Sequence, residues 1–179
     1  MTHITLAVTG SISAYKAADI TSQLTKLGFE VKVLMTPSAQ KFITPLTLQV
    51  LSTNQVGLDV MMEDDPQRIE HIDIGKETDL FLVAPASANT IAKLAMGLAD
   101  NMVTSTALAL PQNTKKLLAP AMNTKMLEHP ATQRNLKLLQ DYGYQIIQPR
   151  DAVLACGDKG SGALATIEAI VEAVKENCL

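Results

Sequence analysis

The sequence predicts a single α/β domain, residues 1–179, built as a three-layer α/β/α sandwich around a parallel sheet. Three observations predict it. Short apolar runs recur along the chain, helical patterns lie between them, and a length of 179 residues suits one domain with a sizeable core. Strands that alternate with helices are joined by right-handed crossovers, which place successive strands in parallel.

The predicted strands are short runs rich in apolar and β-branched residues. Because they are apolar throughout rather than alternating, they indicate strands buried on both faces of the sheet. The runs are residues 4–8, 31–35, 80–84, 117–119 and 145–147.

The predicted helices fill the intervals between these strands. Ser13 is expected to cap the first helix, whose apolar residues recur at roughly helical spacing, and Gly28 is expected to end it. Further helices are expected after Ala88, after Asn101, over residues 131–142 and over residues 166–176. Residues 57–74 break this alternation and are predicted to form a long loop, a feature often found at functional sites or interfaces.

Composition excludes several classes of partner. A net charge of -3, from 15 basic and 18 acidic residues, gives no electrostatic footprint for nucleic acid or an anionic membrane. Two cysteines and no targeting segment predict a reducing cytoplasm, and the three histidines lack the spacing of a metal site. Apolar residues make up 47% of the chain but aromatic ones only 3%, which favours a subunit interface.

Polar loops follow the predicted strands, at the edge where parallel sheets bind ligands. Residues 9–14 hold one glycine and three hydroxyls but lack the glycine fingerprint of dinucleotide folds and the lysine of a P-loop, which disfavours NAD and ATP. A mononucleotide phosphate at the helix N-terminus fits this turn, and so does plain serine capping. Residues 36–39 and 85–90 add hydroxyls that suit either a phosphate or a helix cap.

Three side chains are candidates for chemistry. Asn123 has an amide that suits a substrate carboxylate, the cap of a short helix, or both. His71 is alone, and a lone histidine is more often structural than catalytic. Cys156 stands among glycines, which predicts a flexible flap carrying a thiol; the alternative is a surface turn with an incidental cysteine.

Together these motifs resemble the homo-oligomeric flavin-containing cysteine decarboxylase family, over nearly the whole chain. The resemblance rests on residues 10–12, His71-Ile72, residues 84–90 continuing to residues 99–101, residues 120–123, and residues 155–158 with Gly160 and Gly162. It implies a Rossmann-like fold of flavoprotein type, with FMN bound where subunits meet in trimers or in dodecamers of trimers.

The resemblance also implies roles for particular residues. Asn123 and Ala155 would contact the substrate, with Asn123 on its carboxylate. His71 would act near the flavin and the thiol, and Cys156 would donate a proton from the flap. The residues implied at FMN are Gly10, Ser11, Ile12, Ser38, Ser87, Ala88, Asn89, Thr90 and Ala121.

The implied reaction is the decarboxylation of phosphopantothenoylcysteine to phosphopantetheine in coenzyme A biosynthesis. Losing carbon dioxide needs an electron sink, which a flavin creates by oxidising the thiol carbon to a thioaldehyde before the resulting enethiol is reduced again. A separately encoded synthetase is expected to supply the substrate. The alternatives are a decarboxylase of peptide C-terminal cysteines and a non-catalytic regulatory flavoprotein; a flavin prenyltransferase shares the fold but has no use for the Cys156 flap.

The chain departs from the family pattern at three positions. Leu127 stands where a tryptophan is common, Val153 where a basic residue is common, and Leu164 where a methionine is common. These departures leave the chemistry intact and bear on how the flap contacts the substrate. Lys125 and Lys159, which lie beside the implied motifs, are the candidates for holding the substrate phosphate.

Overall fold

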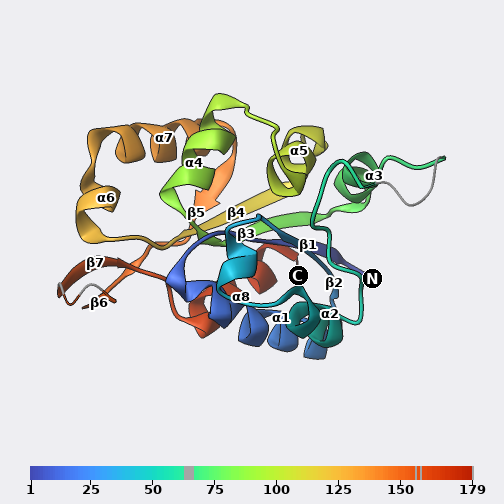
Figure 1. Ribbon diagram of the computed structural model, residues 1–179, viewed down its shortest axis with the longest axis horizontal. Helices are drawn as coiled ribbons and strands as arrows, with labels where there is room; N and C mark the ends of the chain where they lie inside the picture. The colour runs from blue at the N-terminus through green and yellow to red at the C-terminus, as the bar shows by residue number, and fades with distance from the viewer. Residues whose placement is uncertain (63–66, 156, 158, 179) are drawn as a thin grey trace.

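The computed structural model describes residues 1–62, 67–155, 157 and 159–178, and its centre is a five-stranded sheet (Figure 1). All neighbouring strands in this sheet are parallel, in the order β2-β1-β3-β4-β5. The strands are β1 (His3–Val8), β2 (Glu30–Met35), β3 (Leu80–Ala86), β4 (Lys115–Pro120) and β5 (Tyr144–Ile146). The predicted parallel sheet is confirmed, because each of the five expected strands overlaps one of these.

Helices cover both faces of the sheet, as the three-layer prediction requires (Figure 1). One face carries the 3₁₀ helices η1 (Ile12–Lys16) and η2 (Ala39–Lys41) with α1 (Ala17–Lys26), α2 (Pro45–Ser52) and α8 (Ile167–Cys178). The other face carries α3 (Glu70–Glu77), α4 (Ala88–Met96), α5 (Met102–Ala109), α6 (Thr124–Glu128) and α7 (Pro130–Asp141).

The core consists of two apolar clusters, one on each face of the sheet. Strand β3 shows why: Leu80 and Leu82 pack in the first cluster, whereas Phe81 and Val83 pack in the second, and all four are fully buried. Successive side chains of a strand point to opposite faces. A strand that must fill two cores is therefore apolar at every position, which is the pattern that the sequence shows.

The strand order places a crevice beside β1. The chain runs from β1 outward to β2, then crosses back to β3 on the other side of β1. In open parallel sheets the loops on either side of such a reversal diverge, and ligands bind at the carboxyl ends of the strands there. The loops after β1 and β3 are the ones that flank this point.

Several predicted helix boundaries are confirmed, and one is wrong. Gly28 follows the C-cap of α1 with a φ of 88°, a conformation that glycine adopts without strain. Asn101 caps α5 in a reciprocal arrangement with Thr104. Ser13, however, is not the cap of the first helix: Ser11 is, because its side chain accepts from the Ser13 amide over 3.3 Å.

The expected long loop over residues 57–74 is only partly correct. Its last five residues are the start of α3, which begins at Glu70 and packs against α5. Ile74 is the side chain of α3 that enters the core. A single buried apolar residue in eight leaves no helical periodicity to detect in the sequence.

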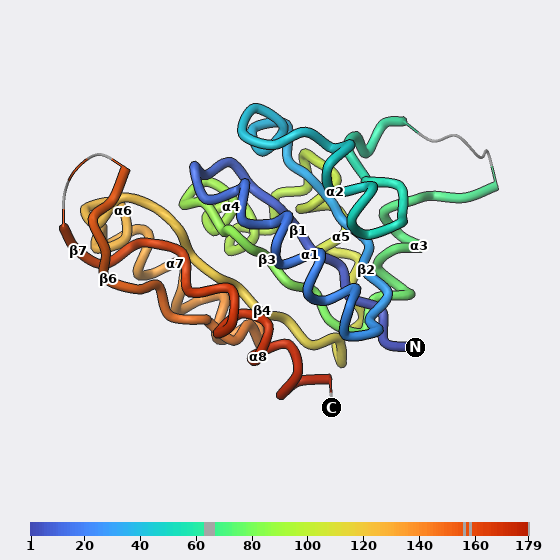
Figure 2. The backbone as a smooth tube through the Cα atoms, turned by 90° about the horizontal axis from the view of Figure 1, so that it is seen from below, coloured from blue at the N-terminus to red at the C-terminus, as the bar shows by residue number. Residues whose placement is uncertain are grey.

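A separate two-stranded antiparallel sheet, not predicted from the sequence, is formed by β6 (Arg150–Val153) and β7 (Lys159–Ala163). Figure 2 shows this hairpin beside α6, at the end of the molecule far from the N-terminus. Its strands are polar and glycine-rich, so they carry no alternation of apolar residues. Part of the predicted flap is therefore a β-hairpin, and Cys156 lies outside the described residues.

The described part of the chain contains no helix that is long and apolar enough to span a membrane. The same residues contain no cluster of acidic, histidine and cysteine side chains that suits a metal ion.

Candidate active site

Two adjoining hollows open at the carboxyl ends of the sheet strands. The larger has a volume of about 520 Å³ and the smaller about 330 Å³, and they share Gly10, Ser87, Ala88 and Met126. We call the larger the cleft and the smaller the hydroxyl pocket, because Thr36, Ser38, Ser87 and Thr90 line it. They lie at the strand-order reversal between β1 and β3, where the fold predicts a ligand.

Glycine at position 10 lets the first two loops meet. A Cβ atom added to Gly10 would lie 2.5 Å from Cβ of Ser38, closer than two carbon atoms can pack. Gly10 and Ser38 both line the hydroxyl pocket. The resemblance assigned both to the cofactor, and the structure brings them into direct proximity.

Thr9 joins the first loop to the third. Its hydroxyl donates to the carbonyl of Pro85 over 2.6 Å and accepts from the amide of Ser87 over 2.9 Å. Thr9 is fully buried, and the neighbouring loop provides both an acceptor and a donor for its hydroxyl, as a buried polar group requires. The cis Ala84–Pro85 bond lies in the same segment.

The hydroxyl pocket includes the N-terminus of α4. Ser87 caps this nine-residue helix by accepting from the Thr90 amide over 3.2 Å. Free amides and the helix dipole make such an end attractive to phosphate. Lys93 and Asp100 also line the pocket and form an ion pair with each other, and the hydrogen bond from Lys93 lowers the pKa of the Asp100 carboxyl.

The β6–β7 hairpin is fastened to the loop after β4. The Met122 amide donates to the Gly162 carbonyl over 2.9 Å, and the Thr124 hydroxyl donates to the Ser161 carbonyl over 2.6 Å. A Cβ atom on Gly162 would lie 2.3 Å from the Met122 carbonyl oxygen. The glycine at this position is therefore what lets β7 dock against the loop.

Asn123 lies in this same loop and lines the cleft. Its side-chain oxygen accepts from the Lys125 amide over 2.9 Å, which makes it the N-cap of α6. Of the two roles that the sequence left open, capping is present in the structure. Because the cap fixes the position of the oxygen, it also fixes the orientation of the amide group beside the cleft.

The structure brings nearly all the described site residues together. Every residue implied at FMN lines one of the two hollows: Gly10, Ser11, Ile12, Ser38, Ser87, Ala88, Asn89, Thr90 and Ala121. Asn123 and Ala155 line the cleft as well. Ala155 directly precedes Cys156, which is itself outside the described residues.

Among the described residues implied at the flavin, at the substrate carboxylate or in catalysis, His71 is the exception. It lies in the first turn of α3 and lines neither hollow. Within one chain, the structure therefore does not bring His71 together with Asn123 and Ala155.

Two basic residues that the sequence analysis did not select also line the cleft. They are Lys16 and Arg150, whereas neither Lys125 nor Lys159 is among its lining residues. Arg150 belongs to the unpredicted hairpin, so sequence reasoning had no basis for placing it. Lys16 lies three residues after Ser13, about one helical turn further along the chain. This spacing was the signal in the sequence that placed Lys16 near the first loop.

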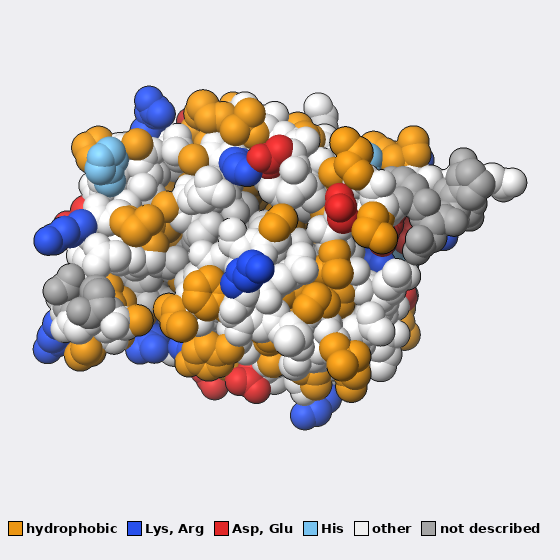
Figure 3. Space-filling view, in the orientation of Figure 1, with side chains coloured by type: hydrophobic (Ala, Val, Ile, Leu, Met, Phe, Trp, Pro, Cys, Tyr) orange, Lys and Arg blue, Asp and Glu red, His pale blue; other side chains and the backbone are white. Residues whose placement is uncertain are grey.

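Large apolar side chains remain exposed around the cleft. Ile12 and Tyr15 are each 57% exposed and Phe42 is 47% exposed, and all three line the cleft. Figure 3 shows that apolar side chains also recur across one whole face of the molecule. Exposed apolar surface around a polar site is typical of a ligand or subunit contact.

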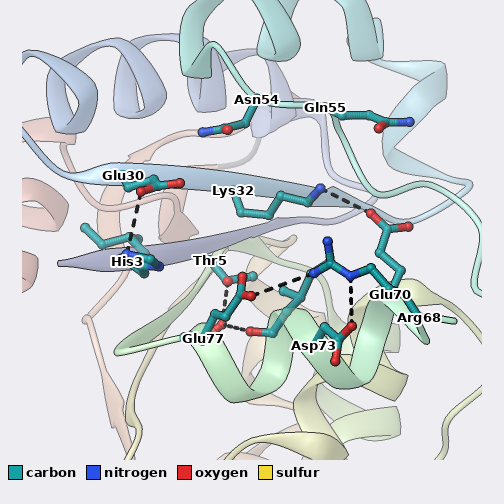
Figure 4. A pocket seen from close by; sticks show the side chains of 13 residues that line it. His3, Thr5, Glu30, Lys32, Asn54, Gln55, Arg68, Glu70, Asp73 and Glu77 are labelled. Atoms are coloured by element: carbon teal, nitrogen blue, oxygen red, sulfur yellow. Dashed lines mark hydrogen bonds and ion pairs between the residues drawn. The ribbon is translucent and has the colours of Figure 1, made fainter. Parts of the chain in front are cut away.

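A third hollow, of about 340 Å³, lies at the opposite edge of the sheet, where β1 and β2 begin (Figure 4). Its cations are paired internally: Lys32 contacts Glu70 at 3.1 Å, and Arg68 contacts Asp73 at 3.1 Å. The hydrogen bond from Arg68 lowers the pKa of the Asp73 carboxyl. This pocket contains none of the predicted site residues.

The two hollows at the carboxyl edge fit a flavin mononucleotide. The hydroxyl pocket offers serine and threonine hydroxyls and a helix N-terminus for a phosphate, and the cleft offers apolar side chains for a ring system. The close approach of Gly10 to Ser38 brings two of the expected phosphate-binding loops to one point.

Comparison with known proteins defines the class. The Flavoprotein family model matches residues 1–179, and the chain belongs to this family. Over 173 residues it is 63% identical to the probable phosphopantothenoylcysteine decarboxylase of Streptococcus mutans serotype c, with 97% of each chain covered. It is 45% identical to the coenzyme A biosynthesis bifunctional protein CoaBC of Bacillus subtilis, covering 98% of this chain but 43% of that protein.

Solved structures agree with this assignment. A PPC decarboxylase mutant complexed with pantothenoylaminoethenethiol superposes with a TM-score of 0.88 at 32% identity, covering 98% of this chain and 97% of that one. The FMN binding protein AtHal3 superposes with a TM-score of 0.85 at 32% identity, covering 98% of this chain and 95% of that one. The Rossmann-like flavoprotein fold is therefore confirmed.

Proposed function

We propose that this chain is an FMN-dependent carboxy-lyase that converts phosphopantothenoylcysteine to phosphopantetheine in coenzyme A biosynthesis. The observation that carries the proposal is the pair of adjoining hollows, which joins every flavin residue expected from the sequence to Asn123 and Ala155. The similarity over 97% of a probable phosphopantothenoylcysteine decarboxylase supports the same substrate.

The chemistry requires a temporary electron sink. A flavin held in the two hollows would supply this sink by accepting two electrons from the thiol-bearing carbon of the substrate, so that the carboxylate could leave as carbon dioxide. The hydroxyl pocket, with Ser38, Ser87 and Thr90, would hold the FMN phosphate. Gly10 and Ala121, both small, would let the ring system approach the backbone.

The chain's own side chains would position the substrate and move its protons. Asn123, held in place as the cap of α6, would orient the substrate carboxylate for departure. Cys156, next to the cleft residue Ala155, would protonate the α-carbon when the enethiol is reduced. The β6–β7 hairpin would cover the cleft and exclude water, so that the proton comes from the thiol.

A single chain does not complete this site, because His71 lies outside both hollows. We place His71 at the cleft of a neighbouring subunit, in a homotrimer or a dodecamer of trimers. The exposed Ile12, Tyr15 and Phe42 around the cleft supply apolar surface for that contact. His71 would there assist the substrate thiol, since imidazole exchanges protons near neutral pH.

The pathway neighbour and the compartment are part of the same proposal. The relative from Bacillus subtilis is named as a bifunctional protein more than twice as long, since this chain spans 43% of it. We expect a separately encoded phosphopantothenoylcysteine synthetase to produce the substrate in the same cytoplasm, where a reduced thiol persists.

The test is an anaerobic incubation of the purified protein with phosphopantothenoylcysteine, following flavin absorbance and product mass together. A yellow protein that releases carbon dioxide and forms phosphopantetheine is the expected result. Parallel reactions contain a peptide ending in cysteine, which a peptidyl-cysteine decarboxylase would prefer. A yellow protein that turns over neither substrate would contradict the proposal and favour a regulatory flavoprotein.

A further inference from the structure

We propose that Arg150, assisted by Lys16, binds the phosphate of the substrate and selects phosphorylated over unphosphorylated pantothenoylcysteine. This inference rests on the proposed function and adds to it a residue that determines specificity. It replaces Lys125 and Lys159, the candidates from the sequence, neither of which lines the cleft.

The charge of the cleft is the first observation. Among the described residues that line it, Lys16 and Arg150 are basic and none is acidic. The whole protein has a net charge of -3, so the sign of the charge in the cleft is opposite to that of the protein as a whole. A cleft lined by one sign of charge attracts ligands of the opposite sign.

The state of these cations is the second observation. The ion pairs within the described residues include neither Lys16 nor Arg150. The basic residues of the pocket in Figure 4 are different, because Lys32 and Arg68 are both held by carboxylates there. Within the described part of the chain, no carboxylate therefore neutralises the two cations in the cleft.

Arg150 is also oriented by the fold. It is the first residue of β6 and pairs with Ala163 of β7. Its Nε donates to the carbonyl of Leu164, a fully buried residue, over 3.1 Å. This bond holds the planar guanidinium at the cleft, and such a group binds phosphate through two parallel N–H donors.

Lys16 lines the cleft from a different segment of the chain. It ends η1, on the loop that follows β1, and its ammonium lies 6.0 Å from the centre of the Tyr15 ring. Tyr15 lines the cleft too. The two cations thus come from segments more than 130 residues apart in sequence, at positions 16 and 150, and the fold brings both to the lining of one cleft.

Two ligand anions must be divided between the two hollows. The hydroxyl pocket suits the FMN phosphate, since it has hydroxyls and the α4 N-terminus, and its one lysine is neutralised by Asp100. The cleft contains Asn123 for the substrate carboxylate together with the two available cations. If these cations bind the substrate phosphate, then the FMN phosphate, the substrate carboxylate and the substrate phosphate each have separate hydrogen-bond donors.

The experiment compares two substrates, phosphopantothenoylcysteine and pantothenoylcysteine, on the holoenzyme and its Arg150→Gln and Lys16→Gln variants. Lys26→Gln, on the exposed end of α1, is the matched control for removing one positive charge. We expect Arg150→Gln to lower kcat/KM for the phosphorylated substrate by about 10- to 100-fold, the loss typical of one charge-assisted contact, mainly through KM. Turnover of the unphosphorylated substrate should change less than about threefold, and Arg150→Lys should restore part of the loss.

Four outcomes would overturn the inference. Equal losses on both substrates would indicate a general role in the cleft, and no loss on either would show that Arg150 does not contact the phosphate. Loss of bound FMN, measured as flavin absorbance per protein, would assign the residue to the cofactor. If the wild-type protein decarboxylates neither substrate, the proposed function itself fails and the inference falls with it.

Discussion

The backbone amide of Ser87 donates to the side-chain oxygen of Thr9 over 2.9 Å, although the two residues belong to different strand ends. Because the same hydroxyl also donates to Pro85, one buried side chain sets the separation between the loops after β1 and β3. Those loops carry most of the expected FMN contacts, so Thr9 supports the cofactor site without lining it.

Thr9→Val should therefore weaken both the fold and FMN binding. Valine keeps the shape but leaves the partly buried Ser87 amide without its acceptor, which costs about 1–3 kcal/mol. Thermal unfolding of the apoprotein and fluorescence titration with FMN would measure the two effects. Thr9→Ser retains the hydroxyl and is the control; equal FMN affinity in all three proteins would contradict this role.

Gly162→Ala should detach the hairpin from the loop that holds Asn123. Its φ of 130° is strained for alanine, and the added Cβ would collide with the Met122 carbonyl. Gly97→Ala is the matched control, because Gly97 has a φ of 68° but open space around its Cβ position. We expect the rate of decarboxylation to fall at least tenfold in Gly162→Ala, because displacing the loop that holds Asn123 misplaces the substrate. Gly97→Ala should keep its activity and lose only about 1 kcal/mol of stability. Similar activities in the two variants would argue against docking as the cause.

Cys156→Ser should separate the two halves of the reaction. A serine hydroxyl is too weak an acid to replace the thiol, so one equivalent of carbon dioxide and of the enethiol should form per bound flavin, which then stays reduced. Mass spectrometry of the product distinguishes the enethiol from phosphopantetheine by two hydrogens. Cys178→Ser, in the last turn of α8, is the control. Full phosphopantetheine formation by Cys156→Ser would rule out this proton donor.

Mixed oligomers test where His71 acts. His71→Asn and Cys156→Ser should each be inactive in phosphopantetheine formation, because each lacks one required group. If His71 serves the cleft of a neighbour, subunits of the two variants that are unfolded and reassembled together contain some complete sites, and activity returns. Activity that stays absent after mixing, with assembly verified by light scattering, would place both groups in the same chain.

The pair Lys93–Asp100 should stabilise the protein in a pH-dependent way. The pKa of Asp100 lies below its ordinary value of 3.8, mainly because Lys93 donates a hydrogen bond to it. A lowered folded-state pKa gives stabilisation that is complete above 3.8 and is lost as the pH falls through the folded-state pKa. Asp100→Asn should therefore lower Tm at pH 7 but not at low pH, where both carboxyl and amide are neutral. A constant difference across the range would contradict the linkage.

Much of the fold could be predicted because the central strands fill two cores. Leu80, Phe81, Leu82 and Val83 are all fully buried, and continuous apolar runs of this kind mark parallel strands in a sequence. The positions of the polar loops then follow from topology, since the carboxyl ends of parallel strands share one edge. This is why the FMN residues expected from the sequence line one connected pair of hollows.

The hairpin, the position of Arg150 and helix α3 could not be predicted, because they depend on contacts between residues distant in sequence. Strand β7 is held by Met122 and Thr124 rather than by an apolar face of its own, so its sequence carries no strand pattern. Arg150 reaches the cleft only through that hairpin, and α3 shows a single core residue, Ile74. Ser11 replaces Ser13 as the helix cap because the first helical segment begins with a 3₁₀ turn at Ile12. Helix propensity does not distinguish between two serines so close in sequence.

The attachment of β7 to the loop after β4 links two events that a flexible cover would keep apart. Because the Met122 amide and the Thr124 hydroxyl both bind the backbone of β7, the hairpin cannot lift without disturbing the residues on either side of Asn123. If the hairpin covers the cleft and Asn123 holds the substrate, as we propose, opening the cover would also loosen the grip on the substrate. An enzyme built this way would release its product and lose its hold on the reacting group in the same step, rather than in sequence.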